Sequence, residues 1–353
     1  MKFEFSEEHE ALRELVGDIC ARTATSRACY DGDRGLDHQL WSALCAAGMA
    51  GIGVPETWEG GGGGPVEQAI VAEELGRIVA GVPFSEHAAA ADAVMRLGSD
   101  EQRTRFLLPL ARGHSLAGIV LAQPATLATV TAHRDGAQWR LRGHLPLVPN
   151  AAAASVLVVP ALVEQHVRWF VTDTAHITAL PTVDRTRPAA AVDFADTAAD
   201  LLAGGEATPR HRELLLTLAA AEAAGAASTA LHTTARYTTE RHQFGLPIGT
   251  FQAVKHRLAD MLVAVENARS AVYGAAWTLA DEQPAERAAA LAQAVATENG
   301  VTVVSAAIQL HGGIGVTWEC DLHLYLRRVK ALEMTYGPPT THRAIIADTL
   351  LGS

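Results

Sequence analysis

The chain has 353 residues, of which 49% are hydrophobic and 19% are charged, and its formal net charge is −11. This composition is typical of a globular protein with two or three packed units. An acidic chain lacks the basic face that nucleic acid binding requires, which excludes nucleic acid and an anionic membrane as expected partners. No apolar run reaches the roughly 18 residues of a membrane span, and the charged N-terminus has no apolar signal core.

The four cysteines of the chain are Cys20, Cys29, Cys45 and Cys320. They form no C-x-x-C pair, so the sequence predicts neither a zinc site nor a dithiol redox motif. Their irregular spacing favours reduced thiols in a cytoplasmic protein that binds no metal.

Residues 1–113 are predicted to be helical. Ser6 is the expected N-cap of a first helix, in which apolar residues then recur at helical spacing. Further helices are expected at residues 40–47, 66–78, 88–97 and from 99 onward. The five glycines at 60–64 predict a mobile loop, and no G-K-[ST] follows them that would make a phosphate-binding loop.

Residues 114–207 change to short β-prone runs separated by turn residues such as Asp135-Gly136. These runs are residues 116–121, 139–141, 155–159, 167–171 and 192–194. The segment therefore predicts a compact β domain.

Residues 208–353 return to long helices, at 214–241, 251–279, 285–311 and 320–332. Four helices of this length predict an antiparallel bundle. Their alanine and leucine faces exceed what one bundle core needs, so an oligomer built through this region is expected. The fold class is α+β, with a helical, a β and a second helical domain in that order.

Two glycine-containing breaks between the long helices stand out as binding motifs. The first is R-H-Q-F-G-L-P-I-G-T-F-Q at residues 241–252, and the second is Q-L-H-G-G-I-G at residues 309–315. Glycine lets a ligand approach the backbone closely, and the N-terminus of a following helix favours an anion. The forked guanidinium of Arg241 suits a pyrophosphate. Each motif alone is also compatible with a plain helix-turn-helix corner.

Together these motifs, followed by L-H-L-Y-L-R-R at residues 322–328, resemble the C-terminal domain of the acyl-CoA dehydrogenase family. Val54-Pro55-Glu56 with the glycine loop, and residues 98–110, are similar to the N-terminal helical domain of that family. The resemblance implies a middle β-barrel or sandwich domain and a C-terminal four-helix bundle.

The resemblance also implies FAD as the cofactor. In the family, the matching positions hold the adenine diphosphate half of a flavin that is seated mainly in a neighbouring subunit. The expected cofactor-binding residues are Arg241, Phe244, Gln252, Gln309, Gly312 and Gly313.

The half of the site that would hold the flavin ring departs from the family pattern. The usual T-E-P-x-x-G-S motif corresponds to residues 121–126, of which Pro124 is kept. The usual W-I-[TS] segment corresponds to Leu147-Val148-Pro149, where the proline removes a backbone donor. We therefore expect this β domain to bind the isoalloxazine ring poorly or not at all.

The catalytic base is the second departure. Removing a proton α to a thioester carbonyl needs a carboxylate within hydrogen-bond reach, and most of the family places a glutamate in a Y-E-G-T turn. Alignment on Gly337 puts Tyr336 there, and tyrosine with a pKa near ~10 is a poor base. Some relatives use the first turn of the helix before the R-x-Q-F-G motif, where Glu213 lies two residues from the aligned position. Glu213 is either that base or a charge that stabilises a helix N-terminus.

Two functions follow from the resemblance. One is an FAD-dependent acyl-thioester dehydrogenase that forms an α,β-double bond and acts within an oligomer. The other is a non-catalytic partner subunit of a heteromeric acyl-CoA dehydrogenase, which supplies adenine-diphosphate contacts and lacks the base. The ending G-P-P-T-T-H-R at residues 337–343 is similar to such partner subunits, including those linked to steroid side-chain degradation.

The implied substrate is an acyl-CoA or an acyl-carrier-protein thioester. Electron-transfer flavoprotein or a similar acceptor would take the electrons, and a homo- or hetero-oligomer, dimeric or tetrameric, is expected. A third possibility keeps the fold with a flavin-free or tailoring role on a carrier-protein thioester.

Overall fold

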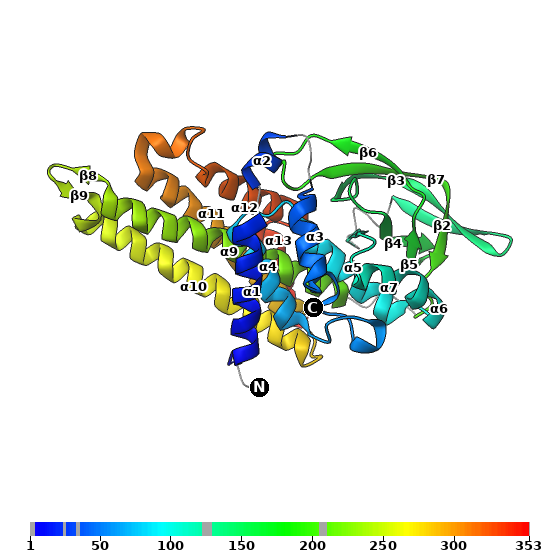
Figure 1. The fold of residues 1–353 in the computed structure, drawn as a ribbon. Helices are drawn as coiled ribbons and strands as arrows, with labels where there is room; N and C mark the ends of the chain where they lie inside the picture. The colour runs from blue at the N-terminus through cyan, green and yellow to red at the C-terminus, as the bar shows by residue number, and fades with distance from the viewer. Residues whose placement is uncertain (1–3, 24–25, 33–35, 122–128, 205–209, 353) are drawn as a thin grey trace. The chain divides into compact units, whose positions relative to one another are not determined.

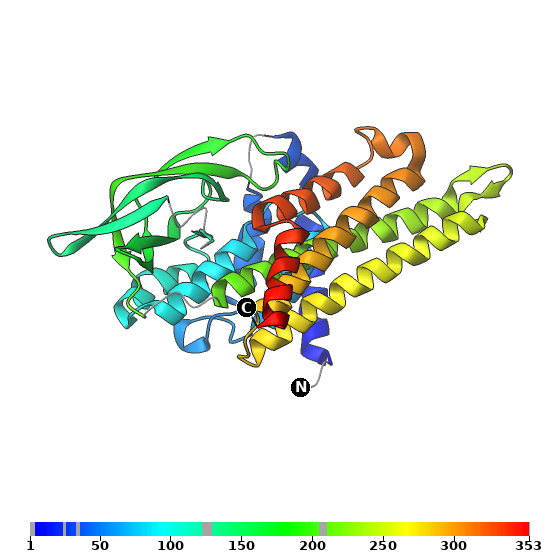
Figure 2. The ribbon, with the colours of Figure 1, turned by 180° about the vertical axis from the view of Figure 1, so that it is seen from behind.

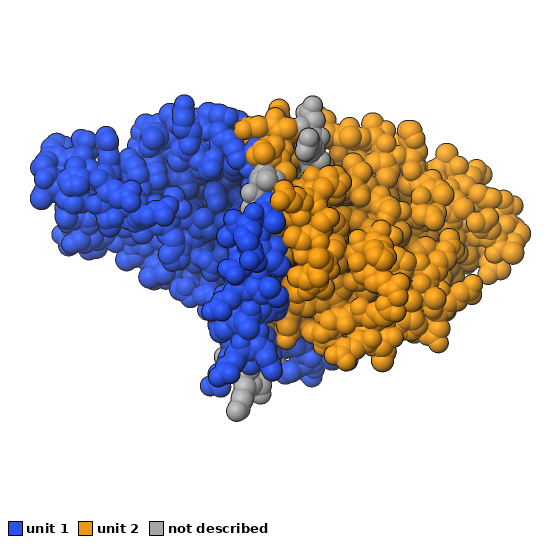
Figure 3. Space-filling view, in the orientation of Figure 1, with its two compact units in different colours: residues 1–27, 69–80, 216–353 blue, residues 28–68, 81–215 orange. Residues whose placement is uncertain are grey.

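The computed structural model describes residues 4–23, 26–32, 36–121, 129–204 and 210–352. The chain divides into two compact units that interleave along the sequence (Figure 3). Unit 1 comprises Met1–Arg27, Ala69–Ala80 and Leu216–Ser353, and unit 2 comprises Ala28–Gln68 and Gly81–Leu215.

Helices precede and follow a central run of strands, which confirms the predicted α–β–α order (Figure 1). The first helices are α1 (Glu7–Thr23), α2 (Ser26–Asp31), α3 (His38–Ala46), α4 (Pro65–Arg77), α5 (Phe84–Leu97), α6 (Asp100–Gln102) and α7 (Leu108–Ala111). Between them lie the short 3-10 helices η1 (Met49–Gly51) and η2 (Glu56–Trp58) and the π-helical turn η3 (Arg103–Leu107). The predicted cap at Ser6 is present, since the amide of His9 donates to Ser6 Oγ. Ser99, where a further helix was expected to start, forms a capping box with Gln102.

The strands are β1 (Ala117–Ile119), β2 (Val130–Asp135), β3 (Gln138–Pro149), β4 (Val156–Val163), β5 (His166–Thr172), β6 (His176–Leu180) and β7 (Ala189–Leu201). Strand β4 pairs with β2 and with β5, and β3 pairs with β7, so the order β4-β2-β3-β7-β5 returns to β4. This closed sheet is the expected β domain and leaves few unpaired edges. Its interior is built from alternate residues of the strands, including Leu141, Leu157, Phe170 and Val192.

Strands β2 and β6 were absent from the sequence expectation. Strand β2 carries His133, Arg134 and Asp135 in its second half, and most of β6 is exposed. Strand β6 pairs only with β7 among the described strands, and none of its five residues is fully buried. Both are held by neighbouring strands rather than by their own hydrophobic pattern.

The glycine run at residues 60–64 is a hydrogen-bonded loop rather than a loose connection. The amides of Gly61, Gly62 and Gly63 donate to carbonyls of residues 51–54 at 2.9 Å. A Cβ on Gly60 would lie 2.0 Å from the carbonyl oxygen of Val54. Glycine is needed here because the two backbone segments are in direct contact.

Unit 1 is a helical bundle (Figure 2). Its later elements are α9 (Arg210–Glu240), β8 (His242–Gln243), β9 (Leu246–Pro247), η4 (Ile248–Thr250), α10 (Gln252–Ala280), α11 (Glu286–His311), η5 (Gly312–Val316), α12 (Leu322–Tyr336) and α13 (Pro339–Leu351). The four predicted long helices are confirmed. Helix α13 is additional: Pro339 occupies its first turn, where proline is well tolerated.

Helix α9 is long and apolar enough to cross a membrane by composition, but 94% of that window is buried inside the protein. From residue 216 onward it lies at the centre of unit 1. Its Ala227, Ala230 and Leu231 pack with residues of α10, α11 and α12. Helix α9 is therefore a core helix.

Helices α4 and α9 touch through their backbones. A Cβ on Gly76 would lie 2.1 Å from the carbonyl oxygen of Glu222, and one on Gly225 would lie 2.0 Å from that of Glu73. Such a crossing is possible only where both helices present glycine at the contact.

The close packing of α4 on α9 buries Glu73, which is 1% exposed. Arg13 of α1 donates to it at 2.9 Å and Arg269 of α10 at 2.8 Å, and the hydroxyl of Tyr273 donates as well. Burial alone would raise the pKa of Glu73, but Arg269 and Arg13 outweigh it and the pKa is lowered. One carboxylate thus joins α1, α4 and α10.

We expect Glu73→Gln to destabilise unit 1 by about 3–5 kcal/mol, because it removes the buried carboxylate that the half-buried guanidinium groups of Arg13 and Arg269 share. Since the folded pKa of Glu73 is lowered, its contribution is present above the unfolded pKa and is lost as pH falls through the folded pKa. The free-energy difference between variant and wild type should shrink on acidification in urea titrations. Glu10→Gln removes the exposed partner of the same Arg13, at 3.8 Å, and should cost under about 1 kcal/mol. Equal effects of the two variants would contradict this assignment.

Candidate functional site

The two glycine motifs lie at the same end of the bundle (Figures 1 and 2). The ring of Tyr237, near the end of α9, stacks on the ring of His311, the last residue of α11, with centroids 4.1 Å apart. The Tyr237 hydroxyl also donates to the carbonyl oxygen of His311. Helix α9, which ends just before Arg241, and helix α11, which ends just before Gly312, are therefore fixed together.

The first motif forms a hairpin between α9 and α10. Phe244 (φ 52°) and Gly245 (φ 79°) connect β8 to β9, which is the two-residue turn that fits the twist of a hairpin. The side chain of Phe244 is 92% exposed, and its ring meets that of Phe251 edge-on at 6.2 Å. The positive φ of Phe244 strains its backbone, and its exposed ring offers an apolar surface that another molecule could cover.

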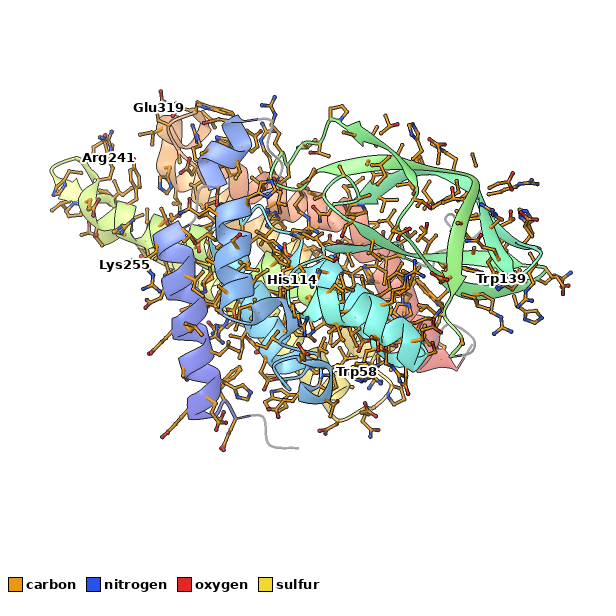
Figure 4. All side chains as sticks on the ribbon, turned by 45° about the vertical axis from the view of Figure 1, so that its right-hand side comes forward. Trp58, His114, Trp139, Arg241, Lys255 and Glu319 are labelled. Carbon is orange, nitrogen blue, oxygen red and sulfur yellow. The ribbon has the colours of Figure 1, made fainter. Side chains whose placement is uncertain are left out.

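Arg241 is exposed at the end of α9, and Lys255 is exposed near the start of α10 (Figure 4). Among the residues that the structure describes, no carboxylate forms an ion pair with Arg241. Gln252 is exposed at the N-terminus of α10, where the backbone amides point outward and the helix dipole is positive. This end of the bundle offers donors and positive charge to an anion such as a pyrophosphate.

The second motif, residues 309–315, leaves its backbone uncovered at two glycines. Gly312 has φ 63° and ψ −138°, a conformation that is essentially restricted to glycine. A Cβ on Gly312 or Gly313 would meet nothing within 4 Å. Gln309 is exposed one turn earlier on α11. The turn therefore leaves room for a ligand to lie against the backbone. No neighbouring atom in the described part of the chain requires glycine at these two positions.

All six expected cofactor residues are thus exposed at one end of unit 1. They comprise a guanidinium, two side-chain amides, an aromatic ring and two open glycines, which suits the phosphates and the adenine of a dinucleotide. The residues present therefore fit the adenine diphosphate half of FAD.

Tyr336, at the aligned position of the base, is buried as the last residue of α12. Its carbonyl oxygen accepts a hydrogen bond from Nε2 of His342, which is 0% exposed, at 3.1 Å. Gly337 (φ 108°) packs against the same imidazole, since a Cβ there would lie 3.1 Å from Nε2. His342 was missed by sequence reasoning, although its place just after G-P-P, where a new helix begins, was a signal.

Glu213 lies in the first turn of α9 and is 5% exposed. The helix begins at Arg210, four residues earlier than the sequence predicts, so Glu213 lies within its first turn. Two residues earlier, His211 meets the ring of Trp169 at 4.1 Å, and burial lowers its pKa to about 4. Glu213 belongs to unit 2 and Tyr336 to unit 1, so the two candidates stand on different parts of the chain.

The half of the site expected to hold the flavin ring is described in part. Leu147 is exposed, Val148 is buried, and Pro149 ends β3. Residues 122–126, which correspond to most of the T-E-P-x-x-G-S motif, lie outside the described residues. Among the described residues, no group of three His, Cys, Asp or Glu side chains is arranged to hold a metal ion.

The chain matches the family model of the acyl-CoA dehydrogenase N-terminal domain over residues 6–114 and that of the C-terminal domain over residues 217–351. It is 35% identical to the acyl-CoA dehydrogenase IpdE2 of Mycolicibacterium smegmatis, across 95% of this chain and 96% of that protein. A solved variant of the steroid ACAD Tcur3481-Tcur3483 is 32% identical, with a TM-score of 0.90 and 98% of both chains covered. The ChsE4-ChsE5 complex from Mycobacterium tuberculosis is 29% identical, with a TM-score of 0.91 and both chains fully covered.

The chain runs from a helical region through a β domain to a second helical region, and one end of its bundle suits a dinucleotide. Together with the matches above, these features define a flavin-dependent oxidoreductase that acts on CH–CH groups. The chain belongs to the acyl-CoA dehydrogenase family, whose cofactor is FAD.

We expect Gly312→Ala to destabilise the protein by about 1–3 kcal/mol, because alanine does not tolerate this backbone conformation even where there is space for its methyl group. Gly313→Ala is the matched control: Gly313 has an ordinary φ, so its thermal midpoint should stay near that of the wild type. Circular dichroism melting of both variants checks the prediction. An unchanged midpoint for Gly312→Ala would show that the turn relaxes freely.

Proposed function

We propose that this chain is a subunit of an oligomeric acyl-thioester dehydrogenase that introduces an α,β-double bond. When bound, FAD supplies the hydride acceptor for the β carbon of the acyl group. The observation that carries the proposal is the set of six exposed cofactor residues at one end of unit 1. A flavin held there by its adenine half needs a further protein surface to enclose it, which the proposal assigns to a neighbouring subunit.

The roles of the residues follow from their chemistry. Arg241 pairs with the pyrophosphate, and the exposed ring of Phe244 packs on the cofactor or on the neighbouring subunit. Gln252 and Gln309 donate to phosphate or adenine through their amides. Gly312 and Gly313 let the cofactor approach the backbone. The substrate would be an acyl-CoA or acyl-carrier-protein thioester, electron-transfer flavoprotein or a similar acceptor would reoxidise the flavin, and we place the protein in the cytoplasm.

Glu213 is the carboxylate that this proposal assigns as the base for the α proton. It lies in the first turn of α9, and it is buried as a general base shielded from water would be.

A second candidate function is a non-catalytic partner in a heteromeric dehydrogenase. The observation that favours it is the turn at Tyr336, where the family usually carries a glutamate. Here the tyrosine is buried, its carbonyl is capped by His342, and Pro338 and Pro339 follow. Two of the similar solved structures bear paired names, Tcur3481-Tcur3483 and ChsE4-ChsE5. In this role the chain supplies adenine-diphosphate contacts to a subunit that carries the base.

We expect Arg241→Ala to weaken FAD binding about 10- to 100-fold, because a charge-assisted hydrogen bond to phosphate is worth about 1.5–3 kcal/mol. Flavin per subunit, measured by absorbance after gel filtration, should fall in whichever oligomer the chain forms. Arg287→Ala is the control, since Arg287 is exposed at the opposite end of α11. Full flavin in the Arg241 variant would remove that residue from the site.

We expect Glu213→Gln to reduce acyl-thioester turnover about 10²- to 10⁴-fold while Tyr336→Phe leaves it nearly unchanged, because only the first removes a general base. Dye reduction with straight-chain, branched and steroid acyl thioesters measures both. Turnover that appears only with a glutamate-bearing partner subunit, and that ignores Glu213→Gln, would replace the first candidate function by the second.

A further inference from the structure

The turn at Gly312 and Gly313 is uncovered, so its shape depends on the residues that flank it. A Cβ on either glycine would meet nothing within 4 Å in the described chain. Glycine loses more conformational freedom than any other residue when a ligand orders it, and here two glycines are adjacent. A turn that is already ordered costs less free energy to occupy. The contacts at both ends of this turn therefore affect how tightly it binds a cofactor.

The beginning and the middle of the turn are fixed to the bundle. His311, directly before the glycines, stacks on Tyr237 of α9. Gly315 packs against the end of α11, since a Cβ there would lie 2.4 Å from the carbonyl oxygen of Ile308. These contacts do not reach past Val316, which is 79% exposed. The rest of the loop before α12 has to be held by other residues.

Those residues are Arg27, Trp318 and His323, named the Trp318 cluster from here on. The guanidinium carbon of Arg27 lies 4.8 Å from the ring centroid of Trp318, a favourable cation–π contact. The imidazole of His323 stacks on the same indole at 24°, with centroids 4.6 Å apart. Glu319, which is labelled in Figure 4, marks this loop. Arg27 ends the first stretch of unit 1, so the whole cluster lies within that unit.

Arg27 also binds the backbone of the loop. One nitrogen of its guanidinium donates to the carbonyl oxygen of Trp318, and another donates to the carboxylate of Asp321. Lysine has no planar fork with which to reproduce this pair of bonds together with the contact to the indole. Arg27 precedes Trp318 by 291 residues, so a side chain from near the start of the sequence fixes the loop between α11 and α12.

His323 connects the Trp318 cluster to helix α12. It belongs to the motif L-H-L-Y-L-R-R at residues 322–328, whose Tyr325 donates to the carbonyl oxygen of Arg77 on α4 at 3.1 Å. This bond anchors the first turn of α12 to the bundle. The motif therefore holds His323 in place under Trp318, which gives these residues a role that the list of cofactor residues did not include.

We infer that Arg27, Trp318 and His323 are positioning residues of the cofactor site. They hold the loop that follows Gly312-Gly313 and thereby order the turn before the adenine diphosphate half of FAD binds. The charge of Arg27 is balanced by Asp321, so Arg27 acts through the backbone rather than as a cation for the phosphates. This role rests on the cofactor end assigned in the proposed function.

The test measures FAD binding by the full chain, in the oligomer that it forms, and hydrogen exchange of the flavin-free protein. Arg27→Ala should speed amide exchange over residues 314–321. It should also raise the apparent Kd for FAD about three- to tenfold, because fewer chains have an ordered turn. Exchange in α10 should stay as in the wild type. Arg22→Ala, which removes an exposed arginine from the last turn of α1, is the matched control and should change neither measurement.

Further variants separate positioning from charge. Arg27→Lys keeps the charge and should still lose affinity, whereas Trp318→Phe keeps a ring in the cluster and should bind FAD more tightly than Trp318→Ala. Combining Arg27→Ala with Trp318→Ala should add little to the larger single loss, because both remove the same cluster. The losses of Arg27→Ala and Arg241→Ala should multiply, because these residues share no partner.

Circular dichroism identifies a misfolded variant, in which case Arg27→Lys and Arg22→Ala decide. Wild-type affinity in Arg27→Lys, or an equal loss in Arg22→Ala, would overturn the positioning role, as would unchanged exchange of the loop in Arg27→Ala. If Arg241→Ala loses flavin while the Trp318 cluster variants keep it, the proposed function stands and this role fails. If Arg241→Ala also keeps its flavin, the proposed cofactor site fails with it.

Discussion

The architecture of unit 1 depends on the backbone contact between α4 and α9. Gly76 and Gly225 let the helices approach until a side chain on either would overlap a carbonyl oxygen. This approach excludes water from Glu73, whose charge must then be neutralised by Arg13 and Arg269. Helices α1 and α10 are thereby tied to the same point. Because α10 begins where the hairpin after α9 ends, the contact also orients the end of the bundle that presents the cofactor residues.

The long helices of unit 1 were predictable because each carries many turns of consistent apolar spacing. Strands β2 and β6 were not, since each is short and is held by neighbours rather than by its own pattern. Helix α13 was not, since it buries only His342 and shows no apolar face in the sequence. The glycine turns of the site could be located because a break between two strong helices is a local signal. The bond between Tyr273 and Glu73 spans 200 residues of sequence, and no local pattern announces such a contact.

The two candidate positions for the base differ in the physics of their surroundings. At the end of α12, a tyrosine is buried, a histidine satisfies its carbonyl, and a glycine with positive φ fits against the imidazole. In the first turn of α9, Glu213 is buried. Sequence reasoning could name both residues, but it could not give the packing around either of them.

The end of unit 1 that carries Phe244 has a consequence for handling the isolated protein. Phe244, Leu246, Val316 and Trp318 are all at least half exposed there, and each is an apolar side chain in water. Apolar surface associates more strongly in the presence of excluded salts such as sulfate. The lone chain should therefore salt out early and adsorb to hydrophobic resins, and its colloidal behaviour should improve when a cofactor and a neighbouring subunit cover this surface.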